Sequence, residues 1–191
     1  MSFSMLLYAI VSSTRSPDNG DFRFSSSSSF AVSYQPRFHV VLHQPEIPPN
    51  TGAVGRTCVA LAAKLWLVRP LGFRVDEATL RRAGLDYWEK LQWQAVDNWE
   101  HLLRSLPDSR FWYFSKTAKR RFTDVQFQFN DALVFGSETS GLPPSFLSKS
   151  PDQTLCIPTT GLVRSLNLSC SVAVAGYELD RQFHVQSPAT Q

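Results

Sequence analysis

The segment 134–143 contains a polar turn directly after a short apolar run. Gly136 and Gly141 flank this turn, and glycine lets the backbone adopt a positive φ and approach a ligand closely. Between them, Glu138 can accept hydrogen bonds from backbone amides or shape a binding site. Residues 136–141, here called the glycine loop, therefore form a candidate ligand-binding turn. Taken alone, the loop also fits an ordinary connection between a strand and a helix.

Two further segments carry polar side chains beside predicted helix starts. Asn50 follows Pro48 and Pro49, and Arg56 lies further along the same predicted helix. Arginine keeps its proton because its pKa lies above about 12, so Arg56 suits phosphate binding better than proton removal. In the segment 165–169, Asn167 lies at the entry to the last predicted helix, where asparagine is a common cap.

Basic residues gather in two stretches of the chain. Cations bind phosphates, and aromatic rings such as Tyr87 and Trp88 in the first stretch can stack on unpaired bases. This combination favours a nucleic acid partner, although solvated surface charge is the alternative, above all for the second stretch. The first stretch contains Arg69, Arg74, Arg81, Arg82 and Lys90, and the second contains Lys116, Lys119, Arg120 and Arg121.

Short apolar strands alternate with helices along the chain, which favours an α/β domain with a mostly parallel sheet. Ligands of such sheets bind at the carboxyl ends of the strands, where the segments above lie. We expect Asn50 and Asp97 to cap two of the helices. The predicted strands are 38–42, 65–68, 111–114, 131–135 and 155–157, and the predicted helices are 51–64, 80–83, 97–105 and 166–182.

Composition excludes several classes of protein. The 191 residues are 43% hydrophobic and 18% charged with a net charge of +3, which is ordinary for a globular domain. No run of about eighteen apolar residues exists, so no membrane span is expected. The three cysteines lack a C-x-x-C pair and predict neither disulfides nor a zinc site. The histidines show no ligand spacing, so we expect no metal.

Residues 1–37 differ from the rest of the chain. They contain eleven serines but only two acidic residues, Asp18 and Asp21, together with three arginines. Such a composition is typical of an organelle transit peptide, and the serine content favours the chloroplast. The alternatives are import into the mitochondrion, or a merely disordered extension of a cytoplasmic protein. We expect the folded domain at 38–183 and a tail at 184–191.

The four segments 45–56, 80–88, 134–143 and 157–169 together resemble the SPOUT superfamily of RNA methyltransferases. The similarity is greatest to the tRNA (cytidine/uridine-34)-2′-O-methyltransferase family and extends from about Phe38 to Gln182. It implies a trefoil-knotted α/β fold, S-adenosylmethionine as the methyl donor, a homodimer, and tRNA as substrate. Ala53, Ser115–Thr117 and Cys170 depart from the family pattern, which leaves details of the substrate open.

The resemblance also assigns roles to individual residues. It gives Arg56 and Asn50 as the catalytic residues, with Arg56 at the reacting hydroxyl and Asn50 fixing the loop and the helix start. It places Tyr177 near the RNA or in the dimer interface. For Leu142 and Ile157, core packing is compatible with cofactor contact. The implied cofactor residues are Phe114, Gly136, Glu138, Gly141, Leu142, Ile157, Ser165 and Asn167, and the implied RNA-binding residues are Arg81, Arg82, Tyr87, Lys116 and Tyr177.

Three other functions are alternatives to tRNA methylation. A relative that methylates another RNA, such as organellar ribosomal RNA, would share every motif. A catalytically silent RNA-binding dimer is disfavoured by the intact Arg56, glycine loop and 165–169 segment. A dehydrogenase is disfavoured because no G-x-G-x-x-G follows the first predicted strand.

Overall fold

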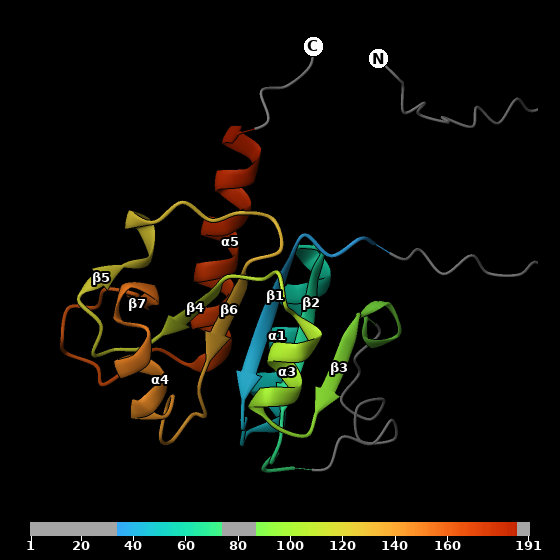
Figure 1. Ribbon diagram of the computed structural model, residues 1–191, viewed down its shortest axis with the longest axis horizontal. Helices are drawn as coiled ribbons and strands as arrows, with labels where there is room; N and C mark the ends of the chain where they lie inside the picture. The colour runs from blue at the N-terminus through green and yellow to red at the C-terminus, as the bar shows by residue number, and fades with distance from the viewer. Residues whose placement is uncertain (1–33, 74–86, 187–191) are drawn as a thin grey trace, which may run out of the picture. The chain divides into compact units, whose positions relative to one another are not determined.

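The computed structural model describes residues 34–73 and 87–186. Within them, seven strands form one sheet in the order β3-β2-β1-β6-β4-β7-β5, and every hydrogen-bonded pair is parallel (Figure 1). The predicted α/β class with a parallel sheet is confirmed, while the trefoil knot stays a prediction. The strands are β1 (Phe38–His43), β2 (Ala63–Val68), β3 (Trp93–Val96), β4 (Phe111–Phe114), β5 (Arg120–Arg121), β6 (Ala132–Phe135) and β7 (Thr154–Cys156).

Helices cover both faces of the sheet, with α3 (Trp99–Ser105) in front of it and α1 (Pro48–Ala60) and α5 (Leu168–Gln186) behind it in Figure 1. Successive strand side chains point to opposite faces. In β1, Val40 and Leu42 therefore pack in the cluster that contains α1 and α5. Val41 packs in the other cluster, with α3 and α4 (Pro144–Lys149). Burial on both faces explains the continuous apolar runs of the central strands.

The start of α1 differs from the prediction. Ile47 is the N-cap residue and makes no side-chain cap bond, while Pro48 and Pro49 occupy the first turn. Proline suits that position because its fixed φ is helical and its missing N–H would have no partner in the helix. The prediction of Asn50 as the cap is therefore wrong, and its amide is available for contacts outside α1.

Several other boundaries also differ. Asn98, not Asp97, caps α3 by accepting a hydrogen bond from the backbone N–H of His101 at 2.8 Å. Helix α5 spans Leu168–Gln186 and so continues past the predicted helix end at residue 182. The sequence did not predict β3, β5 or α4, nor the short 3-10 turns Trp88–Lys90, Phe122–Asp124 and Pro151–Gln153. The predicted turn at 80–83 lies outside the described residues.

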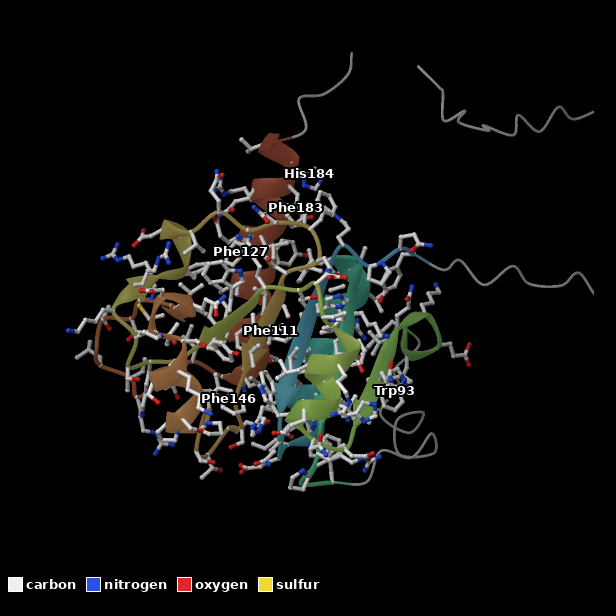
Figure 2. All side chains as sticks on the ribbon, viewed as in Figure 1. Trp93, Phe111, Phe127, Phe146, Phe183 and His184 are labelled. Carbon is white, nitrogen blue, oxygen red and sulfur yellow. The ribbon has the colours of Figure 1, made fainter. Side chains whose placement is uncertain are left out.

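An aromatic cluster anchors α4 to the sheet. The Trp99 ring centroid lies 4.5 Å from that of Phe146 and 5.7 Å from that of Phe111. Figure 2 labels Phe111 and Phe146. The buried His43, the last residue of β1, contacts Phe146 edge to face with centroids 5.2 Å apart. Burial lowers the pKa of His43, so this imidazole packs in its neutral form. The cluster thereby fixes the position of α4, which directly follows the glycine loop.

Candidate functional site

A cavity of about 840 Å³ lies at the carboxyl ends of β4, β6 and β7. Its walls come from the residues that follow these strands, from the first turn of α1, and from the segment that leads into α5. This is the edge of a parallel sheet where ligand sites are expected. A smaller cavity of about 310 Å³, between residues 123–126 and the end of α5, contains none of the predicted site residues.

The predicted cofactor residues all line the large cavity. They are Phe114, Gly136, Glu138, Gly141, Leu142, Ile157, Ser165 and Asn167, and the cavity also includes Asn50 and Lys116 from the other predicted sets. Residues from four separate segments of the sequence therefore meet at one cavity.

The glycine loop folds back on itself at the cavity wall. A Cβ on Gly136 would lie 2.0 Å from the carbonyl carbon of Gly141, so no larger residue fits without moving the backbone. Gly141 has a φ of +71°, a conformation that glycine adopts without strain. Its N–H donates to the carbonyl of Ser137 at 2.9 Å, which closes the turn. The two glycines thus have distinct roles: close approach at Gly136 and backbone reversal at Gly141.

Glu138 connects the glycine loop to the start of α1. Its carboxylate accepts hydrogen bonds from the backbone N–H of Glu46 at 2.9 Å and of Ile47 at 3.3 Å. A carboxylate at this position also interacts favourably with the positive end of the α1 dipole. Acceptance of backbone hydrogen bonds, which the sequence suggested for Glu138, is confirmed. Glu138 therefore holds the two residues that lead into α1, the N-cap Ile47 and the preceding Glu46.

Asn50 forms the centre of a hydrogen-bonded chain across three segments. Its side-chain Nδ2 donates to Glu138 Oε1 at 2.9 Å, and its Oδ1 accepts from Asn167 Nδ2 at 3.0 Å. Asn167 Oδ1 in turn accepts from the backbone N–H of Ser169 at 2.8 Å. Asn167 therefore caps α5 and lines the cavity at the same time, so the two roles proposed for it are compatible.

The walls of the cavity combine apolar and polar groups. The rings of Phe114 and Phe135 stack with centroids 4.6 Å apart and an interplanar angle of 15°. Leu142 is buried and Ile157 half-buried beside the cavity, so each also packs in the protein, as expected. Exposed Lys116 and Arg164 add positive charge to the lining. This arrangement suits a ligand with a flat apolar part and polar or anionic parts.

Three predicted residues lie outside the cavity lining. Arg56 is exposed on α1, with its guanidinium carbon 4.6 Å from the ring centroid of Tyr87. Tyr87 is only 8% exposed, which does not fit the expected stacking on an RNA base. Tyr177 on α5 is 57% exposed. Arg81 and Arg82 lie outside the described residues.

Sequence reasoning missed several residues of the lining. Phe135, Ser137 and Thr139 flank residues that were identified, and the motif that contains them could have indicated all three. Arg164 directly precedes Ser165, and its charge was a usable signal in a protein expected to bind RNA. In the part of the chain that the structure describes, no group of three or more His, Cys, Asp or Glu residues could hold a metal ion. Nor does any helix in that part have the length and hydrophobicity needed to cross a membrane.

Comparisons with known proteins agree with the family that the sequence segments resemble. A model of the SpoU rRNA Methylase family matches residues 37–177. The tRNA (cytidine(34)-2′-O)-methyltransferase of Methylovorus glucosotrophus (strain SIP3-4) is 42% identical over 146 residues, which cover 76% of this chain and 95% of the relative. A protein solved in a study of 2′-OH methylation of C/U34 on tRNA is 44% identical with a TM-score of 0.73, and the match covers 78% of this chain and 97% of that one.

A more distant structure shares the fold alone. The SpoU methyltransferase AviRb from Streptomyces viridochromogenes, in complex with AdoMet, is 21% identical with a TM-score of 0.68, over 83% of this chain and 63% of that one. Together with the matches above, this confirms the resemblance indicated by the four sequence segments. The chain belongs to the SpoU rRNA Methylase family.

Proposed function

We propose that the protein transfers a methyl group from S-adenosylmethionine to the ribose 2′-hydroxyl of nucleotide 34 of tRNA. One observation carries this proposal: the cavity unites every residue that the family resemblance assigned to the cofactor. The names of relatives at more than 40% identity support position 34 as the target.

The residues present fit S-adenosylmethionine. The cavity volume of about 840 Å³ lies in the range usual for small-molecule sites. Stacked Phe114 and Phe135 provide an apolar wall, and the glycine loop brings backbone groups to the same cavity. Ser165 and Asn167 supply further polar groups. When bound, the cofactor supplies a methyl group on a positively charged sulfur, which makes that methyl electrophilic.

The protein must then orient the hydroxyl and allow its proton to leave. Glu138 and Asn167 hold the Asn50 amide from both sides, which fixes this side chain where α1 meets the cavity. Such fixed geometry lowers the barrier by aligning the reacting atoms. The guanidinium of Arg56 is a hydrogen-bond donor without acceptor capacity, so it binds the phosphate next to the reacting ribose and orients the hydroxyl. The hydroxyl proton passes to water or to that phosphate.

Charge around the cavity supports a polyanionic substrate. Lys116 and Arg164 line the cavity and are exposed, and Lys119, Arg120 and Arg121 follow Lys116 along the chain. Nucleotide 34 lies in the single-stranded anticodon loop, where bases and backbone are open to a protein surface. Here Lys116 and Arg164 contact phosphates and guide the ribose toward the cavity.

A homodimer completes the proposed enzyme. Exposed residues recur along the start of α5 and the segment before it: Leu166, Cys170, Val174 and Tyr177. Within α5, the spacing of Cys170, Val174 and Tyr177 by three or four residues places these three on one face. An apolar face of this kind suits contact with a second copy, which would supply part of the RNA-binding surface. We assign Val174 and Tyr177 to this contact.

The composition of residues 1–37 supports import into the chloroplast, as set out above. A fusion of these residues to a fluorescent protein, expressed in leaf cells, tests this proposal. Fluorescence in chloroplasts is expected, and fluorescence in mitochondria or the cytoplasm contradicts it.

Methyl transfer from labelled S-adenosylmethionine tests the proposed reaction. The full chain is incubated with total tRNA or with organellar ribosomal RNA, and the modified nucleotide is mapped. A 2′-O-methyl group at tRNA position 34 is expected, and Gly136→Ala serves as the inactive control. Label in ribosomal RNA alone would reassign the substrate. Cofactor binding without transfer to either RNA would identify a silent RNA-binding protein.

A further inference from the structure

Tyr87 makes two contacts with α1, and both concern the turn that carries Arg56. Its hydroxyl donates a hydrogen bond to the backbone carbonyl of Gly52 at 2.7 Å. Gly52 precedes Arg56 by four residues, which is about one helical turn. The face of the Tyr87 ring lies under the Arg56 guanidinium, with 4.6 Å between the guanidinium carbon and the ring centroid. One side chain therefore holds both the backbone and the cation of this turn.

The residues after Tyr87 fix its position by close packing on α1. A Cβ on Gly55 would lie 3.0 Å from side-chain atoms of both Trp88 and Leu91. The absence of a side chain at Gly55 therefore lets the segment 87–91 approach the helix directly. Tyr87 is 8% exposed and its hydroxyl is buried against α1, so its ring has little freedom to move.

A fixed ring restricts an exposed arginine. Arginine has many rotamers in solution and loses entropy when one of them must be selected for reaction. A cation over an aromatic face is attracted by the electron density of the ring, which favours the rotamers that keep this contact. The contact uses the flat face of the guanidinium, whereas the N–H donors that bind a phosphate lie on its edges.

We propose that Tyr87 is a positioning residue that holds the Arg56 guanidinium ready for the RNA, and not a base-stacking residue. This inference rests on the proposed function, because it assumes that Arg56 acts in methyl transfer. Tyr87 contributes to the rate only through Arg56, so its effect must disappear when Arg56 is removed.

A double-mutant cycle tests this dependence. The proteins compared are the wild type, Tyr87→Leu, Arg56→Ala and the double variant, all as the full chain with tRNA and saturating cofactor. In the presence of Arg56, Tyr87→Leu is expected to lower kcat by about three- to tenfold, the effect of losing one cation–π contact. In the Arg56→Ala background the same substitution should change kcat by less than about twofold. Affinity for S-adenosylhomocysteine should stay unchanged throughout.

Tyr87→Phe provides a second variant that keeps the ring. It loses the bond to Gly52 but keeps the ring over Arg56, so it should retain more activity than Tyr87→Leu. Tyr34→Phe is the matched control, because the Tyr34 hydroxyl also donates to a backbone carbonyl, that of Ala63, at 2.8 Å. Tyr34→Phe should leave kcat unchanged, which separates loss of a buried hydroxyl from loss of arginine positioning.

NMR gives a readout that does not depend on activity. The Tyr87 ring should shift the Arg56 side-chain proton signals, and this shift should persist in Tyr87→Phe and vanish in Tyr87→Leu. An equal loss of kcat from Tyr87→Leu with and without Arg56 would overturn the proposal, as would the absence of the ring shift. Full activity of Arg56→Ala would instead reject the role of Arg56, and no methylation of tRNA by the wild type would reject the proposed function.

Discussion

The carboxylate of Glu138 and the side-chain amide of Asn50 form a 2.9 Å hydrogen bond between residues that lie 88 positions apart in the sequence. Two backbone N–H groups at the start of α1 share the same carboxylate. A single acidic side chain thereby joins the glycine loop to the helix that carries Arg56. Changes at Glu138 should therefore affect both the stability of the protein and its activity.

Glu138→Gln should lower stability by about 1–3 kcal/mol, because a neutral amide accepts hydrogen bonds more weakly than a carboxylate. It should also weaken cofactor binding, since the glycine loop loses its tie to α1. Urea unfolding and calorimetric titration with S-adenosylhomocysteine measure the two effects. Glu178→Gln is the control, because Glu178 pairs with Arg181 on α5, apart from the large cavity. Cofactor affinity equal to that of the wild type would contradict this account of Glu138.

Gly136→Ala should abolish cofactor binding. The added methyl would lie 2.0 Å from the Gly141 carbonyl carbon, so the loop must open to admit it. Gly161→Ala is the matched control: Gly161 has a φ of +82° but no atom within 4 Å of the added Cβ. That variant should lose only about 1 kcal/mol from backbone strain. Comparable cofactor affinity in the two variants would show that the close approach at Gly136 is not required.

Lys116→Ala and Arg164→Ala should weaken tRNA binding without changing cofactor affinity. With one phosphate contact fewer, tRNA binding releases fewer counterions. The magnitude of the slope of log K against log salt concentration should therefore decrease by about 0.7–0.9 for each residue. Filter binding at several salt concentrations measures the slope. Lys149→Ala is the control, because Lys149 at the end of α4 does not line the cavity. An unchanged slope for both cavity variants would place the RNA elsewhere.

Val174→Glu should yield a monomer that lacks methyl transfer. Val174 is 42% exposed on α5, and a buried carboxylate in a subunit contact is costly. Sedimentation velocity determines the oligomeric state, and the transfer assay with tRNA determines activity. Val185→Glu, at a 70% exposed site near the end of α5, is the control and should remain dimeric and active. A verified monomer with full activity would refute the need for a second subunit.

Stability should decline as the pH falls below about 6.5, partly because of His39. Trp66 Nε1 donates to His39 Nδ1 at 3.2 Å, so the proton of the neutral ring sits on Nε2, 2.8 Å from Asn130 Oδ1. Burial lowers the pKa of His39, against the opposing effect of the Asn130 bond. The unfolded chain therefore binds the proton more readily, and stability rises with pH up to the unfolded pKa of about 6.5.

Urea unfolding between pH 5 and 8 measures this decline. His39→Leu should reduce it, whereas His101→Gln, at a half-exposed position, should not. If the stability of the wild-type protein does not change between pH 5 and 8, His39 is protonated equally well in the folded and unfolded states.

Much of the sheet and the cavity lining could be predicted because strong local signals marked them. Runs such as Phe111–Phe114 are apolar throughout since both faces of the sheet are covered, and glycines mark the loop after β6. The strand β5 was missed because Arg120 and Arg121 are exposed and carry no hydrophobic pattern. The short edge strand β3 was missed because only Val96 in it is fully buried.

The errors at individual site residues have a different origin. Asn50 has the residue type of a helix cap, but its partners Glu138 and Asn167 are far away in the sequence, so no local pattern reveals them. Tyr87 has the residue type of a stacking platform, but its contact with α1 depends on the packing of Gly55 against Trp88. Sequence patterns thus identify which residues belong to the site, whereas long-range packing decides what each of them does.

The chain of hydrogen bonds through Asn50 also constrains the order of folding. Its links span 88 and 117 residues of sequence, and contacts of such long range form late because the intervening chain must first be ordered. Asn167 immediately precedes the last helix, so the ribosome must synthesise most of the chain before the final link can close. A nascent chain that still lacks α5 would therefore possess the glycine loop and the sheet but no finished cofactor site.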